Sequence, residues 1–126
     1  MEENEISKII VDRAFKIHKR LGPGLFESVY QGALAYELKK SGLEIETEKD
    51  IPIHYEDMVF DKGFRADIVV NNKVIIELKS IKKLEDVHFK QLLTYLKLSG
   101  LKLGLLINFN ETLLKNGIKR IINGQI

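Results

Sequence analysis

The N-terminal part of the chain repeats apolar residues with the period of an α-helix. Apolar side chains return every three or four positions over residues 5–21, and they do so again over residues 25–40. Gly22-Pro23-Gly24 separates the two stretches, and Ser41-Gly42 follows the second, as is common where helices end. The pattern therefore predicts two successive helices.

Short extended runs follow these helices. They cover residues 45–48, 51–55 and 58–60, with Glu56-Asp57 as a turn between the last two. Pro52 has no backbone N–H group, which favours an edge strand or an irregularity at this point. A bend is expected at Gly63-Phe64, just before a further hairpin.

The C-terminal part combines a third helix with two strands. Residues 84–99 have a helical pattern closed by Gly100, and residues 103–109 form an almost wholly apolar run, typical of a strand buried on both faces. The last segment, residues 118–122, favours a strand over a helix. The order of elements predicts an α/β fold: a mixed β-sheet flanked by helices, in which the third helix crosses over to the buried strand.

Residues 65–80 carry charges inside two apolar runs, where an unpaired charge would be costly. Asn71-Asn72-Lys73 separates the runs and predicts a β-hairpin. A two-residue turn would place Glu77 on the apolar face, whereas a three-residue loop sets Asp67 opposite Glu77, with Lys79 on the same face. The second register is preferred, because Asn tolerates the left-handed conformation that such loops use.

Composition sets wider limits. With 126 residues, of which 44% are apolar and 30% charged, we expect a single globular domain, residues 1–126. The chain has no cysteine, which excludes disulfides and any cysteine-based metal site or nucleophile. A net charge of +2 does not by itself indicate a nucleic-acid binder. The acidic start, and the lack of an apolar run of about 20 residues, predict no membrane partner and a cytoplasmic location.

The hairpin charges have the chemistry of a metal site. Asp67 and Glu77, about 5 Å apart across a strand pair, can share a hard divalent cation. Magnesium suits two carboxylates because it keeps several waters and binds phosphate oxygens, and the backbone carbonyl of Leu78 could add a ligand. Lys79 could orient or deprotonate the nucleophile, or offset charge that develops on phosphorus. The arrangement fits metal-assisted hydrolysis of a phosphodiester.

These residues resemble the D…(D/E)-x-K core of the PD-(D/E)XK nuclease superfamily, which includes Holliday-junction resolvases and many restriction endonucleases. Asp67 matches the first carboxylate, and Glu77-Leu78-Lys79 matches the rest. The run Gly24-Leu25-Phe26-Glu27-Ser28-Val29-Tyr30 also matches the Gly-x-x-Glu-x-x-Tyr signature of the small GxxExxY family within it. The resemblance covers nearly the whole chain and implies a restriction-endonuclease-like fold. Ala66 replaces the proline of the family's name, a change that does not touch the chemistry.

The resemblance also implies roles for individual residues. Asp67 and Glu77 would be the main metal ligands, with Glu27 approaching from the second helix, and Lys79 would be the catalytic lysine. Gln91 matches a polar residue that contacts water or phosphate and completes the catalytic set. The implied cofactor is Mg²⁺, with Mn²⁺ as a substitute. Substrate contacts are expected from Tyr30, Arg65, Lys82 and Tyr95.

Each assignment has a simpler alternative. The hairpin charges could form only a structural ion pair on a solvated strand face. Glu27 could be only a favourable charge near a helix N-terminus, and Tyr30 could pack in the core. Arg65 could contact phosphate or pair with Asp67. The lysines near the site could be no more than a solvated face.

Taken together, the residues and the resemblance predict a divalent-metal-dependent nuclease, and they favour DNA over RNA as its substrate. The alternative is a nuclease-fold nucleic-acid-binding or regulatory module without catalysis, because a net charge of +2 leaves substrate binding unexplained. A role on small nucleotides or in tRNA processing would use the same site. Related resolvases are dimers, and a chain this small has little surface for duplex DNA, so a homodimer is also implied.

Overall fold

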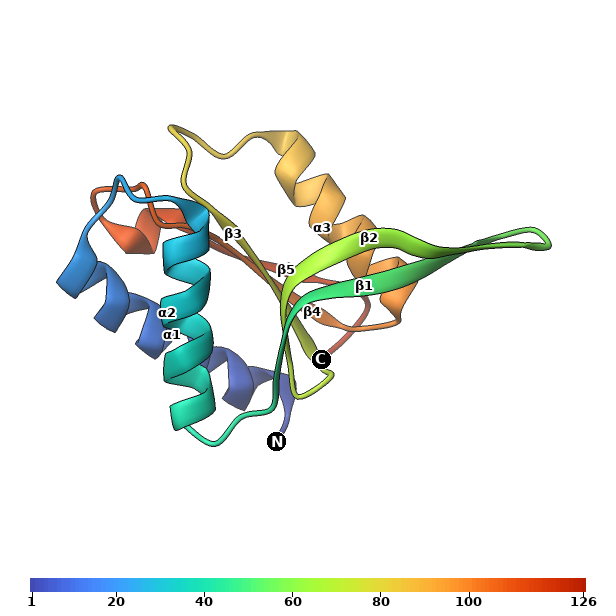
Figure 1. Ribbon diagram of the computed structural model, residues 1–126, viewed down its shortest axis with the longest axis horizontal. Helices are drawn as coiled ribbons and strands as arrows, with labels where there is room; N and C mark the ends of the chain where they lie inside the picture. The colour runs from blue at the N-terminus through green and yellow to red at the C-terminus, as the bar shows by residue number, and fades with distance from the viewer.

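The computed structural model describes all 126 residues and contains three α-helices, five β-strands and one short 3₁₀ helix. Figure 1 shows their arrangement. In chain order they are α1 (Glu3–Leu21), α2 (Glu27–Lys40), β1 (Ile45–Tyr55), β2 (Met58–Val70), β3 (Val74–Lys79), α3 (Asp86–Ser99), β4 (Leu103–Asn108), η1 (Leu114–Gly117) and β5 (Ile118–Ile122).

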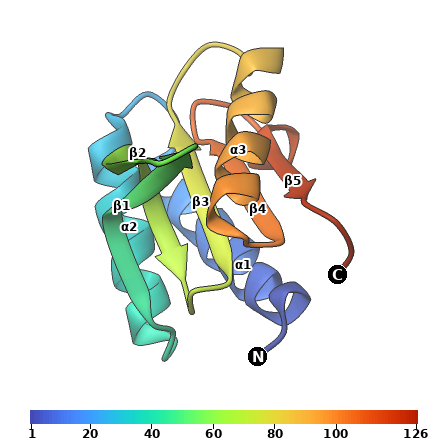
Figure 2. The ribbon, with the colours of Figure 1, turned by 90° about the vertical axis from the view of Figure 1, so that its right-hand side faces the viewer.

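The sheet lies between two layers of helices. Helices α1 and α2 cover one face and α3 covers the other, as the side view in Figure 2 shows. The core between the sheet and the α1–α2 pair contains 19 buried residues, whereas the core under α3 contains seven. Most of the apolar burial that stabilises the sheet therefore lies on the α1–α2 face.

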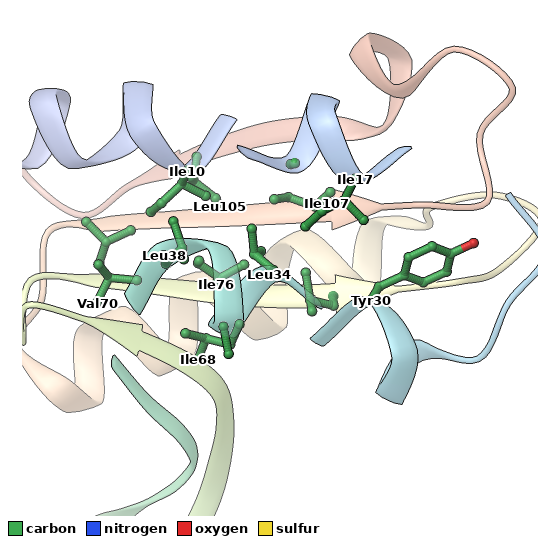
Figure 3. Close-up of a cluster of buried hydrophobic side chains, with 14 of the residues drawn as sticks. Ile10, Ile17, Tyr30, Leu34, Leu38, Ile68, Val70, Ile76, Leu105 and Ile107 are labelled. Carbon is green, nitrogen blue, oxygen red and sulfur yellow. The ribbon is translucent and has the colours of Figure 1, made fainter. Parts of the chain in front are cut away.

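The larger core, shown in Figure 3, is built from the apolar side chains that recur with helical spacing in α1 and α2 and with strand spacing in the sheet. Ile10 and Ile17 of α1, two helical turns apart, are buried with Leu34 and Leu38 of α2 against strand residues such as Ile76. Full burial of one such side chain is worth roughly 1.5–3 kcal/mol. The helices are therefore held by tertiary packing of one apolar stripe each.

The strands are ordered β1-β2-β3-β4-β5, and the sheet is mixed because β3 and β4 are parallel while the other neighbours are antiparallel. Helix α3 forms the crossover between the two parallel strands, as predicted. Every residue of β4 is buried. Gly104 of β4 allows α3 to lie close to the sheet, because a Cβ atom there would be 2.9 Å from the side chain of Leu92.

Strands β1 and β2 continue past the rest of the sheet as a two-stranded ribbon (Figure 1), of which residues 52–63 are called the arm. The pairing shifts between Ile51 and Ile53, so that Pro52 alone faces three residues of β2. A side chain at Gly63 would overlap Ile53. Strand β1 is an edge strand and is irregular at Pro52, so both expectations for this proline are confirmed.

The predicted α/β fold with a mixed sheet is confirmed, and the departures are local. Helices α2 and α3 begin two residues later than predicted, because Phe26 and Glu85 keep an extended backbone as N-caps. The strand β2 continues through Gly63-Phe64 to Val70, and the register shift opposite Pro52 lies at the point where the bend was expected. The last segment is a strand, as predicted. None of the helices is long and apolar enough to span a membrane.

Candidate active site

The hairpin between β2 and β3 has the loop length that the site requires. The two strands pair in the register that leaves residues 71–73 as a three-residue loop. Asn71 and Asn72 have φ angles of 51° and 52°, left-handed values that Asn adopts more readily than most residues. The predicted register is confirmed, and it sets Asp67 opposite Glu77.

Asp67 and Glu77 lie where the pairing of β2 with β3 stops. The last paired residues are Ile68 and Ile76, and beyond them the carboxylates accept the backbone hydrogen bonds instead. The Asp67 N–H donates to Glu77 Oε1 at 3.2 Å, and the Leu78 N–H donates to Asp67 Oδ2 at 2.8 Å. Each carboxylate accepts one backbone N–H, and a hydrogen bond between the two carboxyl groups lowers the pKa of Asp67 and raises that of Glu77. Each group still keeps acceptor capacity for a ligand.

The surroundings disfavour negative charge on both groups. Glu77 is only 8% exposed, and burial together with the neighbouring Asp67 charge raises its pKa to about 8. Burial also raises the pKa of the half-buried Asp67, although the Leu78 N–H opposes the rise. None of the four ion pairs in the molecule includes either carboxylate. The alternative that the hairpin charges form a structural ion pair is therefore wrong.

Lys79 follows Glu77 by two residues and lies on the same face of β3. Its positive charge lowers the pKa of both carboxyl groups, as a smaller contribution than burial. Leu78, which lies between Glu77 and Lys79, packs its side chain into the larger core and donates its N–H to Asp67. The N–H and C=O of one strand residue point the same way, so the Leu78 carbonyl also lies on the Asp67 side.

Glu27 reaches the end of β3 from the first turn of α2. Its Oε2 accepts a hydrogen bond from the Ser80 N–H at 3.3 Å, and Ser80 Oγ donates to the Leu25 carbonyl at 2.6 Å. These two bonds tie the start of α2 to the residue after Lys79. The Glu27 charge contributes to the raised pKa of Asp67, so this third carboxylate is near the pair.

Tyr30 stabilises the loop that precedes α2 by hydrogen bonds from its hydroxyl group. Its hydroxyl donates to the Gly22 carbonyl at 2.6 Å and accepts the Leu25 N–H at 3.1 Å, and its ring stacks on Phe109 with centroids 4.5 Å apart. An exposure of 0% leaves no surface for the substrate contact that the resemblance implied. Tyr30 is therefore a core residue, and its hydroxyl positions the loop that leads to Glu27.

Helix α3 contributes Tyr95 from the opposite side of the sheet to α2. Burial raises the pKa of its hydroxyl, and the charges of Glu77 and Asp67 add to the rise, which places the hydroxyl near both. The Tyr95 ring stacks on Phe64 of β2 with centroids 3.9 Å apart. Gln91 is exposed one turn earlier on the same helix and makes no hydrogen bond to the carboxylates.

The two basic residues expected to contact substrate lie at the margin of the site. Arg65 is exposed, and its Nε lies 3.4 Å from the carboxylate of Asp50. The expected alternative pairing with Asp67 is therefore wrong, since Asp50 on β1 is the acidic partner that the sheet register sets opposite Arg65. Lys82 is exposed in the connection between β3 and α3 and forms no ion pair.

Two supporting residues were missed by the sequence argument. Ser80 anchors the start of α2, as described above. Asn108, at the end of β4, is fully buried and pairs in register with Lys79. Its side chain accepts the Ile81 N–H at 3.1 Å and donates to the Ile81 carbonyl at 2.9 Å, which fixes the chain leaving the site. The sequence does contain a signal for Asn108, because it is the one polar residue at the end of an otherwise apolar strand.

The donor set suits a magnesium ion, although it is not a finished metal cluster. No three acidic, histidine or cysteine side chains lie close enough together to hold an ion. Two carboxylates and the Leu78 carbonyl are hard oxygen ligands, and Mg²⁺ usually binds few protein ligands and keeps several waters. None of the four cavities of the molecule is lined by Asp67, Glu77 or Lys79.

Comparison with known proteins identifies a family for this chain. The model of a family described as the PD-(D/E)XK nuclease superfamily matches residues 4–121, which is nearly the whole chain. Neither the curated proteins nor the solved structures gave a match. The matched residues include all four charged side chains of the site.

Proposed function

The chain belongs to the PD-(D/E)XK nuclease superfamily, and we propose that it is a divalent-metal-dependent nuclease that hydrolyses phosphodiester bonds in DNA. Members of this superfamily are usually nucleases and generally use divalent metals. Within it, the Gly24–Tyr30 run supports membership of the GxxExxY family. The contacts of Glu27 and Tyr30 give that signature a physical meaning. The tyrosine hydroxyl holds the loop before α2, and the glutamate, bonded to the Ser80 N–H, lies near enough to Asp67 to raise its pKa.

One observation carries the proposal: two facing carboxylates, each held by one backbone N–H, with a lysine on the same face and no ion pair to either. A buried acidic pair without a bound cation costs folding free energy, because burial disfavours both charges. A structural role would be served better by apolar side chains. The arrangement is therefore best explained by the cation it can bind.

Asp67 and Glu77 would hold Mg²⁺, with the Leu78 carbonyl as a further ligand and Glu27 at the margin. When bound, the ion would polarise the phosphodiester and stabilise the charge that develops on its oxygens. The backbone hydrogen bonds fix one oxygen of each carboxylate, so the ligands are oriented before substrate arrives. This preorganisation avoids reorganisation during the reaction.

Lys79 would supply positive charge next to the reacting phosphate. It lies on the same face of β3 as Glu77, and it forms no ion pair that would hold it elsewhere. It could orient the attacking water and offset the charge that develops on the phosphate oxygens. Gln91 and Tyr95 on α3 would contact water or phosphate from the other side, while Lys82 would contact the nucleic-acid backbone.

DNA is the proposed substrate and a homodimer the proposed working unit. A single chain of 126 residues has little surface on which to bind a duplex. The formal charge of +2 adds little general attraction for nucleic acid. Affinity must therefore come from local contacts, with Lys82 and Arg65 as the nearest candidates.

A cleavage screen tests the proposal. The purified chain is incubated with single-stranded, duplex and branched DNA and RNA in the presence of Mg²⁺ or Mn²⁺. We expect cleavage of DNA that Lys79→Ala lowers by roughly 10²-fold or more. Lys97→Ala, which removes an exposed lysine at the far end of α3, is the matched control and should cleave normally.

Isothermal titration with Mg²⁺ separates this function from that of a non-catalytic module. We expect binding to the wild-type chain and none to Asp67→Asn, which keeps a side-chain oxygen for the Leu78 N–H. No cleavage of any substrate, together with no Asp67-dependent Mg²⁺ binding, would refute the proposal and favour the module.

A further inference from the structure

The most exposed large apolar side chain of the molecule lies beside the candidate active site. Phe26 is 82% exposed and belongs to neither core. It directly precedes Glu27, the carboxylate that accepts the Ser80 N–H at the end of β3. Leu25 and Val29 next to it are 39% and 43% exposed, so they cover little of the ring. A largely free aromatic ring at this position needs an explanation.

Helix α2 gains nothing from a phenylalanine at this position. Phe26 is the N-cap of α2 and makes no side-chain hydrogen bond to the helix. Ser, Asn and Asp are preferred at an N-cap because their side-chain oxygens accept the free N–H groups of the first turn, which a phenylalanine cannot do. Phe26 therefore serves neither the helix nor the core. Positions that break local rules in this way are expected at functional sites.

The backbone on both sides of Phe26 is held by hydrogen bonds. The Leu25 N–H donates to the Tyr30 hydroxyl at 3.1 Å, and the Leu25 carbonyl accepts a bond from Ser80 Oγ at 2.6 Å. The Phe26 carbonyl accepts the Val29 N–H at 3.1 Å. Because the backbone is fixed, a ligand that contacts the ring has little conformational freedom left to remove. The ring is therefore preorganised for contact.

The segment bonded to this loop is basic. Residues 79–83 contain three lysines and no acidic residue: Lys79, Lys82 and Lys83. None of these lysines takes part in an ion pair. The next acidic residues along the chain, Glu85 and Asp86, lie at the start of α3, where negative charge is favourable. Figures 1 and 2 show the connections before α2 and after β3 at the same end of the molecule.

An exposed ring next to unpaired lysines has the chemistry of a nucleotide site. Lysines bind the phosphates of a nucleic acid, and aromatic side chains stack on its bases. A docked protein would instead require a contiguous apolar patch, whereas one ring dominates the exposed apolar surface here. The proximity of Glu27 places this ring beside the proposed site of cleavage.

We propose that Phe26 stacks on an unpaired base of the substrate, next to the phosphodiester at the carboxylate pair. This inference rests on the proposed nuclease function and narrows its substrate to DNA with unpaired nucleotides near the cut, as in a single strand, an overhang or a branch point. Bases inside a duplex already stack on neighbours on both sides, so an exposed ring reaches the face of a base only where pairing stops. The lysines of residues 79–83 would contact the adjacent phosphates.

A binding assay in EDTA tests the stacking without any metal-dependent cleavage. The probe is single-stranded DNA that contains a fluorescent base analogue whose emission falls on stacking. Phe26→Leu keeps an apolar side chain and removes the ring, so it should weaken binding about tenfold or more and abolish the fall in emission. Phe26→Tyr keeps a ring and should behave as the wild-type chain does. Affinity for a blunt duplex of the same sequence should be the same for all three proteins.

Two further variants separate stacking from effects on the fold. Tyr36→Leu removes a 62% exposed ring further along α2 and should leave single-strand binding unchanged. Phe26→Ser supplies the missing N-cap, so its urea midpoint should rise above that of the wild-type chain while its single-strand binding falls as in Phe26→Leu. Circular dichroism checks that each variant is folded.

The proposal is overturned if Phe26→Leu binds single-stranded DNA as tightly as the wild-type chain, if it weakens duplex binding equally, or if the wild-type chain binds no single strand. It is also overturned if Phe26→Leu changes the oligomeric state in sedimentation velocity, since the ring would then belong to a contact between copies. Stacking and catalysis can fail separately. Binding of single strands through Phe26 without cleavage of any substrate would overturn the nuclease and leave the stacking contact in place.

Discussion

Replacing Glu77 with glutamine should make the protein more stable at neutral and basic pH and at the same time prevent metal binding. Glutamine keeps an oxygen for the Asp67 N–H, and its side-chain N–H₂ group can donate to the Asp67 carboxylate. The substitution therefore keeps the contacts of Glu77 and removes the negative charge that burial and Asp67 disfavour. A residue kept for its fit to the fold would not behave in this way.

The size of the effect follows from the pKa of Glu77, which rises from 4.5 to about 8 in the folded protein. A raised pKa means that the folded state binds this proton more tightly than the unfolded chain does. The stability that results is fully present below pH 4.5 and is lost as the pH rises through 8. At about 1.36 kcal/mol for each tenfold change in proton affinity, the loss is at most about 5 kcal/mol.

Urea unfolding of the wild-type chain and Glu77→Gln in EDTA provides the measurement. The difference between the two proteins cancels the titration of all groups outside the pair. Stabilities should be similar at about pH 4.5, and the variant should be more stable by about 2–5 kcal/mol at about pH 9. At high pH, Mg²⁺ should stabilise the wild-type chain and not the variant. Glu44→Gln, which changes an exposed glutamate outside any ion pair, should show no pH-dependent difference.

A difference between wild type and Glu77→Gln that stays constant with pH would refute this reasoning. It would mean that the Glu77 charge is already compensated within the protein. The same conclusion would follow if Mg²⁺ stabilised both proteins equally. The ion would then bind elsewhere.

Three further substitutions test how the site is supported. Tyr30→Phe loses the hydroxyl that joins Gly22 to Leu25, so urea unfolding should show a loss of about 1–3 kcal/mol, and cleavage should fall because the loop before Glu27 loosens. Glu27→Gln keeps an oxygen for its backbone partner, so it should leave stability unchanged and raise the Mg²⁺ concentration needed for half-maximal cleavage. Gly104→Ala should lower stability by about 1–3 kcal/mol in thermal unfolding, because the new methyl group meets α3, whereas Gly32→Ala, in open space, should not destabilise.

The parts of the fold that could be predicted are those set by short-range rules. The helical period was clear over α1, α2 and α3, and the apolar run over β4, because each of these helices buries one face and β4 buries both faces against its neighbours. The register of the β2–β3 hairpin followed from Asn71 and Asn72, which accept left-handed φ angles. Pro52 indicated the irregular edge strand because it lacks a donor for the ladder.

The parts that could not be predicted depend on contacts between distant segments. Asp50 becomes the partner of Arg65 only because the β1–β2 register shifts opposite Pro52, and the turn at Glu56-Asp57 gives no sign of that shift. The bond from Ser80 to Leu25 joins residues 55 positions apart, and a serine in a loop gives no sign of it. The stacking of Phe64 on Tyr95 likewise depends on how α3 crosses the sheet.

The carboxylate pair depends both on short-range rules and on contacts between distant segments. Where β2 and β3 stop pairing after Ile76, the N–H groups of Asp67 and Leu78 lose their ladder partners, and an unpaired buried N–H costs about 1–3 kcal/mol. The carboxylates supply the missing acceptors, which fixes one oxygen of each group and faces the two groups toward one another. The geometry that suits a divalent cation thus results from the same hydrogen bonds that satisfy the two unpaired backbone N–H groups. Its electrostatic cost is the raised pKa of both groups, and a bound cation is the simplest means of removing it.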